Sequence, residues 1–200
     1  MPQDLPHAIE TPAEPGHPEG RWIPALTTTV VAGEPRRRGL EIELPPSSAA
    51  DLGAFVTPPG VTAPPPTHVL EGTVGDEVRL LGYDVSGDRV GRGGQLEVTL
   101  YFQALASLEG VRFFSHLVGP SAFMNLDHAP VQGSHPLARW RAGQTIRDRF
   151  SIAVPATFAP GAYTLLVGFW RPAGNQRLAV RPLERDDGQR RFSVLTFTVE

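Results

Sequence analysis

The chain of 200 residues contains no cysteine and no lysine. Without cysteine it has no disulfides, no thiolate metal sites and no cysteine nucleophile. Because all eighteen basic residues are arginines, lysine Schiff-base chemistry and serine–lysine nucleophile pairs are excluded as well. The formal net charge of -3 argues against a basic field of the kind that attracts nucleic acid. We therefore expect no nucleic-acid partner.

Long apolar runs are also missing. No run approaches the ~18 residues that a membrane span needs, so we expect no transmembrane segment in this chain. Residues 1–20 are rich in proline and acidic residues and lack the apolar stretch of a secretory signal, so we expect no signal peptide here.

Proline is plentiful and unevenly placed, with fourteen of the 21 prolines in residues 1–66. So many prolines disfavour regular secondary structure and are typical of an arm or linker. We predict that residues 1–70 form a proline-rich arm, partly disordered. Two short extended runs, residues 26–32 and 40–44, are the candidates for one or two added strands.

From residue 71 onward, short apolar runs alternate with turn residues, and no helical period is present. In the run 95–104, for example, every second residue is apolar, which is typical of a strand with one buried face. The predicted strands span residues 78–85, 95–104, 111–118, 146–154, 162–170, 176–180 and 191–199. Seven short strands in about 130 residues predict an all-β, immunoglobulin-like antiparallel β-sandwich over residues 71–200, with a closed barrel as the alternative.

A tyrosine after a proline-glycine turn adds a specific signature. Tyr163 follows Pro160-Gly161 at the start of a predicted strand, which is the setting of the tyrosine corner in immunoglobulin-like sandwiches. The sequence therefore predicts that the Tyr163 hydroxyl binds the backbone a few residues upstream.

Residues 80–199 resemble a soluble β-sandwich accessory domain that is attached to some bacterial multi-spanning membrane glycosyltransferases. The matching stretches are LLGYDVSGDRVGRGGQLEVTLYFQAL (80–105), HLVGP (116–120), LDHAPVQGSHPLARWRAGQTIRDRF (126–150) and PGAYTLLVGFW (160–170). The resemblance implies a sandwich outside the cytoplasm, near envelope glycans or a membrane protein partner. In that family the catalytic carboxylates belong to the membrane portion, so the resemblance does not imply a transferase.

A cluster of polar residues marks the middle of the chain. His116, Asp127, His128 and His135 are the candidate metal ligands, because imidazole and carboxylate together can hold zinc or another divalent ion. A metal-dependent hydrolase centred on residues 116–148 is therefore one alternative. The other interpretation is that Asp127 and His128 fix the long loop through hydrogen bonds to its backbone.

Aromatic residues supply the candidate contacts for a sugar ring. Trp170 follows Phe169 and so points to the opposite face of its strand, either to solvent or against residues 21–66, which include Trp22 and Phe55. Trp140 stands at the entry to a strand, where it can plug the end of the sandwich. The candidate ligand-binding residues are Trp140, Trp170, Asp127, His128 and Arg149.

One acid lies on a predicted core face. Asp148 shares a strand face with Ile146 and Phe150, and a buried carboxylate needs hydrogen-bond or charge partners. We expect those partners in the backbone of the connection 126–143.

No coherent catalytic set emerges from these patterns. We predict a non-catalytic binding or scaffolding module without a cofactor, associated with the bacterial cell envelope and its glycans. The alternatives are the metal-dependent hydrolase and an assembly subunit that contacts a neighbouring chain, or a second copy, through the arm or its sheet edges.

Overall fold

The computed structural model describes residues 30–31, 34–35, 55–120 and 122–200. The chain divides into two units, residues 1–47 and 48–200. In the first unit, β1 (Val30–Val31) pairs antiparallel with β2 (Glu34–Pro35). The predicted strand at 40–44 and Trp22 lie outside the described residues, and the boundary at residues 70–71 stays a prediction.

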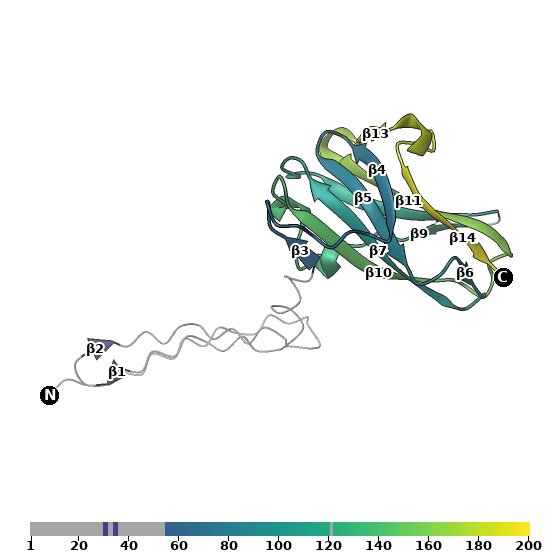
Figure 1. Ribbon diagram of the computed structural model, residues 1–200, viewed down its shortest axis with the longest axis horizontal. Coiled ribbons are helices and arrows are strands. Elements are labelled where there is room, and N and C mark those ends of the chain that lie inside the picture. The colour runs from purple at the N-terminus through teal and green to yellow at the C-terminus, as the bar shows by residue number, and fades with distance from the viewer. Residues whose placement is uncertain (1–29, 32–33, 36–54, 121) are drawn as a thin grey trace. The chain divides into compact units, whose positions relative to one another are not determined.

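The second unit consists of two sheets packed face to face (Figure 1). The first sheet has the order β13 (Val180–Arg181), β4 (His68–Val74), β5 (Val78–Val85), β7 (Gln95–Ala104), β10 (Thr145–Ala153) and β3 (Val56–Thr57). The second has the order β6 (Arg89–Val90), β14 (Phe192–Val199), β11 (Gly161–Arg171), β8 (Arg112–Val118) and β9 (Phe123–Asn125), and β12 (Gln176–Arg177) also pairs with β11. Among these pairs only β14 with β6 is parallel. The fold is therefore the predicted all-β, immunoglobulin-like antiparallel sandwich.

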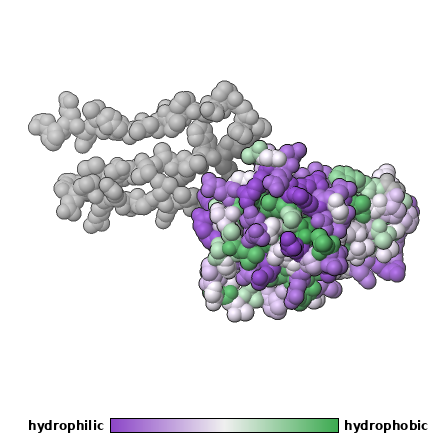
Figure 2. Space-filling model, turned by 90° about the horizontal axis from the view of Figure 1, so that it is seen from above, coloured by the Kyte–Doolittle hydropathy of each residue, from purple (hydrophilic) through white to green (hydrophobic). Residues whose placement is uncertain are grey.

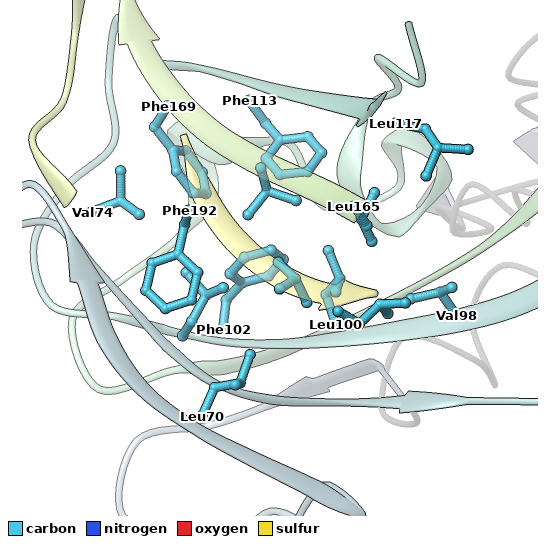
Figure 3. Close-up of a cluster of buried hydrophobic side chains, with 14 of the residues drawn as sticks. Leu70, Val74, Val98, Leu100, Phe102, Phe113, Leu117, Leu165, Phe169 and Phe192 are labelled. Carbon is cyan, nitrogen blue, oxygen red and sulfur yellow. The ribbon is translucent and has the colours of Figure 1, made fainter. Parts of the chain in front are cut away.

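Strict alternation along the central strands builds the core. From β7, the residues Leu96, Val98, Leu100 and Phe102 point inward, and from β11 the residues Tyr163, Leu165, Val167 and Phe169 point inward, as predicted. The rings of Phe102 and Phe169 meet across the gap, edge to face, with centroids 5.8 Å apart. In Figure 3 these two rings lie between the strands of the opposing sheets, with Phe113 beside them.

The tyrosine corner is confirmed. The buried Tyr163 hydroxyl donates to the Ala159 carbonyl over 3.0 Å, and its ring stacks on Phe158 at 5.0 Å. Gly119 is required beside it, because a Cβ at that position would lie 2.1 Å from the Tyr163 ring.

Bulges in β5 and β14 interrupt the alternation, one in each sheet, and the register of β4 against β5 also shifts between Val69 and Gly72. In β5 the extra residue is Leu81, so Leu80 and Tyr83 both face the first sheet's inner side although they are three residues apart. In β14 the extra residue is Val194, so Val194 and Leu195 are both buried. Simple alternation would place Val194 on the same face as Thr196 and Thr198, but the bulge turns it into the core.

The connection from β9 to β10 crosses from the second sheet to the first through two short 3-10 turns, η1 (Pro130–Gly133) and η2 (Leu137–Arg139). Two more, η3 (Pro172–Gly174) and η4 (Leu183–Arg185), lie between β11 and β14. None of the helices in the described part of the chain has the length and apolar character to cross a membrane. On the surface seen in Figure 2, hydrophobic residues form separate patches among hydrophilic ones.

Candidate ligand-binding face

Trp170 lies on the outer side of the second sheet, half-buried. The inward residues of β11 end with Phe169, so Trp170 points outward. It is directly opposite Arg112 of β8 on one side and Arg177 of β12 on the other. Opposite residues of antiparallel strands share a face, with Cβ atoms about 5 Å apart. An indole thus stands between two arginines.

A stacked aromatic ring holds one of these arginines in place. The Phe114 ring lies against Gly168, where a Cβ would come within 2.2 Å of it. The Arg177 guanidinium sits over this ring, 4.9 Å from its centroid, and Nη1 donates to the Gln189 carbonyl over 2.9 Å. A cation over an aromatic face is attracted by the ring quadrupole. We call Arg112, Phe114, Gly168, Trp170 and Arg177 the Trp170 face.

A buried histidine supports this face from the side. His116 packs between the rings of Phe114 and Phe123, at 5.2 and 4.8 Å. The Arg191 Nη1 lies 3.3 Å from His116 Nδ1, so Arg191 donates and Nδ1 accepts. Burial lowers the pKa of His116, and the charge of Arg191 acts in the same direction. A neutral His116 therefore lies beside the face.

Trp140 is not part of any exposed surface. Its side chain is fully buried, its ring packs against Phe102 and Phe169, and its Nε1 donates to the His135 carbonyl over 3.0 Å. The prediction that Trp140 plugs the end of the sandwich agrees with this position. Its place among the candidate ligand-binding residues needs correction, because no ligand can reach a ring with no exposed surface.

Asp127 and Arg149 point to other parts of the sandwich. The Asp127 carboxylate accepts the Ser115 backbone N–H over 2.9 Å and the Asn125 amide over 3.2 Å, which ties the end of β9 to β8. Arg149 lies on the exposed side of the first sheet, 3.5 Å from the Glu97 carboxylate. Arg149 belongs to the first sheet, Asp127 is held by Ser115 and Asn125, and Trp140 is buried, so the five candidates do not converge on one site.

His128 instead holds the connection between β9 and β10 in place through two hydrogen bonds. Its Nδ1 lies 2.8 Å from the Leu126 carbonyl, which can only accept, so Nδ1 carries a hydrogen. Its Nε2 lies 2.8 Å from Asp148 Oδ2. The other carboxylate oxygen of Asp148 accepts the Val131 N–H over 2.8 Å, so the expected backbone partner is confirmed. Val131 has a φ of 55°, a conformation that is strained for a β-branched residue.

The four candidate metal ligands are not gathered into one site. His116 lies beside the Trp170 face, Asp127 binds Ser115, His128 binds Asp148, and His135 Nε2 lies 3.3 Å from Gln144 Oε1. Across residues 55–120 and 122–200, no three His, Cys, Asp or Glu side chains are grouped in a way that could hold a metal ion. The predicted cluster that would centre a hydrolase is therefore not formed there.

The His128–Asp148 contact predicts that the stability of the fold depends on pH. Burial alone would lower the pKa of His128, but hydrogen bonding and the charge of Asp148 outweigh it and raise the pKa above 6.5. A raised pKa stabilises the fold fully below the unfolded value, and this contribution is lost as pH rises through the folded value. We expect the free energy of unfolding to fall as the pH rises above 6.5 and passes through the raised pKa of His128, by about 1.4 kcal/mol per unit of pKa difference.

Urea unfolding at several pH values measures this fall, and His128→Gln is the matched variant because it keeps a polar side chain without a titrating ring. His116 does not mask the effect, since its lowered pKa places its titration below this window. Equal pH slopes for the wild type and His128→Gln above pH 6.5 would contradict the expectation.

No family model matches the chain, and no curated protein matches it. Solved structures with related shape include a Niemann-Pick type C2 protein from Japanese carpenter ant, with a TM-score of 0.41 and 10% identity over 66% of this chain and 97% of that one. The C-terminal domain of wzt has a TM-score of 0.42 and 12% identity over 64% of this chain and 77% of that one. A β-glucosidase from Listeria innocua in complex with glucose has a TM-score of 0.30 and 12% identity, over 58% of this chain and 15% of the enzyme.

Proposed function

We propose that the sandwich is a non-catalytic binding module that recognises acidic glycans of the bacterial cell envelope, outside the cytoplasm, through the Trp170 face. The observation that carries this proposal is the register that sets Arg112 and Arg177 on the two sides of Trp170. An indole offers a flat, largely apolar platform for the C–H face of a sugar ring. A guanidinium binds a carboxylate or phosphate through two parallel hydrogen bonds.

The positive charge of the segment that follows Trp170 favours an acidic rather than a neutral glycan. Residues 171–191, which include β12 and lead into β14, contain six arginines and three acids. Arg177 is already held over Phe114, so binding costs little side-chain entropy. The exposed Arg112 guanidinium makes no hydrogen bond to another described residue and is open to a ligand.

The envelope setting is supported by the sequence resemblance. Residues 80–199 resemble an accessory domain of membrane glycosyltransferases, in which the sandwich lies outside the cytoplasm. A membrane protein of that kind is the partner this proposal implies, and the glycan it handles is the ligand class.

Trp170→Ala tests the proposal directly. We expect the wild-type chain to bind acidic members of an array of bacterial envelope glycans. Trp170→Ala and Arg112→Ala should each weaken the best ligand at least tenfold, about 1.4 kcal/mol, because one loses the stacking platform and the other an anion contact. Isothermal titration calorimetry measures the affinities, and thermal melting verifies that both variants are folded.

Two controls locate the effect. Arg79→Ala removes an exposed arginine from the first sheet and should leave the affinity unchanged. The same glycan with its acidic groups removed should bind at least tenfold more weakly to the wild type. The proposal fails if the wild type binds no glycan on the array, or if Trp170→Ala and Arg79→Ala bind equally.

A further inference from the structure

A hollow lies between the two sheets, away from the Trp170 face. It has a volume of about 290 Å³ and is lined by His68, Tyr83, Val85, Gly87, Asp88, Leu195 and Thr196. Thr196 pairs with Thr164 of β11, six residues from Trp170 along that strand. At about 3.3 Å per residue, the hollow is on the order of 20 Å from the Trp170 face.

The two bulges shape the walls of this hollow. The extra residue Leu81 in β5 turns Tyr83 and Val85 toward the inner side, where they lie opposite Leu100 and Val98 of β7. The bulge in β14 leaves Leu195 buried beside Val194. Tyr83 and Val85 pack against the core yet stay partly exposed. Bulges of this kind re-aim side chains and are common beside functional sites.

The aromatic wall is rigid. The His68 and Tyr83 rings are stacked, with centroids 4.7 Å apart and planes 11° from parallel. The start of β4 is fixed next to them, because the Thr67 N–H donates to Asp84 Oδ1 over 2.6 Å and the Tyr101 hydroxyl donates to Asp84 Oδ2. A ligand would therefore meet a platform that is already ordered.

The rim of the hollow carries the polar groups. The backbone of Asp88 is anchored to β14, since its carbonyl accepts the Thr198 N–H over 2.8 Å. Its carboxylate makes no hydrogen bond to any described residue. Thr196 also lines the hollow, but its hydroxyl is hydrogen-bonded to the Thr164 hydroxyl over 2.9 Å. A carboxylate accepts hydrogen bonds from hydroxyl groups and repels anions.

We propose that this hollow binds one neutral sugar ring, as a site separate from the Trp170 face. Its volume lies at the small end of the range for ligand pockets and suits a single ring rather than a longer chain. The ring's C–H face packs on the Tyr83 side of the aromatic pair and on Leu195. Its hydroxyls donate to the Asp88 carboxylate.

Amide chemical shifts, measured by NMR while methyl glycosides of glucose, galactose and mannose are added to the full chain, test the proposal. We expect saturable shifts at Gly87, Asp88 and Thr196 with at least one glycoside. Asp88→Asn should weaken binding several-fold, because it replaces the acceptor that discriminates against anions. Trp170→Ala should leave this binding unchanged, which separates the hollow from the function proposed above.

A blocking variant with a matched control sharpens the test. A Cβ at Gly87 meets nothing closer than 3.7 Å, so Gly87→Leu can fill the hollow without strain, and we expect at least a tenfold loss. A Cβ at Gly91 has no neighbour within 4 Å, and Gly91 does not line the hollow, so Gly91→Leu should bind as the wild type does. The proposal is overturned if no glycoside shifts these amides, if Gly87→Leu binds normally, or if sodium octanoate binds there instead.

Discussion

Replacing Trp140 by alanine is expected to lower the free energy of unfolding by about 3–5 kcal/mol. The indole is fully buried and packs on Phe102 and Phe169, so its removal leaves a large cavity between the sheets. The His135 carbonyl would also lose the Nε1–H that it accepts. Urea denaturation at constant pH measures the loss.

Two further tryptophan variants serve as controls. Trp140→Phe separates the contribution of packing from that of the hydrogen bond, and Trp170→Ala shows whether the cost depends on burial. Trp140→Phe keeps an aromatic ring but loses the donor, and should cost about 1–2 kcal/mol. Trp170→Ala removes the same side chain from a half-exposed position and should cost about 1 kcal/mol or less. A cost for Trp140→Ala no greater than that for Trp170→Ala would show that Trp140 does not close the sandwich.

The strands of the core were predictable because their signal is local. Residues 78–85 and 95–104 are strands with those bounds, and the faces of β7 and β11 follow the alternation of apolar residues. Tyr163 was predictable for the same reason, since a turn and a tyrosine four residues from its acceptor suffice. Patterns of period two need no information from the rest of the chain.

Cross-strand neighbours were not predictable in this way. Arg112 and Arg177 flank Trp170 only because of the register of β8 and β12 against β11, and no local pattern states that register. The bulges are a second limit. They place Tyr83 and Val194 on the inner side, and each adds one residue that shifts the alternation without a turn residue to indicate it.

Asp148, an acidic residue on a predicted core face, could be interpreted only in part from the sequence. Its place between Ile146 and Phe150 indicated burial and a need for partners, and the Val131 N–H is one of them. The second partner, His128, was expected either to bind a metal or ligand or to fix the loop through its backbone, and its contact with the Leu126 carbonyl agrees with the second interpretation. Twenty residues separate His128 from Asp148, and only the path of the connection across the two sheets brings them together.

Asp148→Ala is expected to lower the free energy of unfolding by about 3–5 kcal/mol. The carboxylate is fully buried, and it accepts from the Val131 N–H and from His128 Nε2, so its removal leaves two donors unpaired. The strained backbone at Val131 also loses the hydrogen bond that holds it. Urea denaturation near pH 6, where His128 is charged, measures the full effect.

Asp148→Asn distinguishes the charge from the hydrogen bonds. The amide oxygen can still accept the Val131 N–H, and the amide nitrogen can donate to Nε2 of a neutral His128, whose Nδ1 hydrogen still reaches the Leu126 carbonyl. The loss in stability should therefore be smaller than for alanine. Without the Asp148 charge, burial governs the pKa of His128, so the fall in stability above pH 6.5 should disappear. If Asp148→Asn keeps the pH slope of the wild type, a different group titrates in this window, and the His128–Asp148 pair is not what couples the connection to pH.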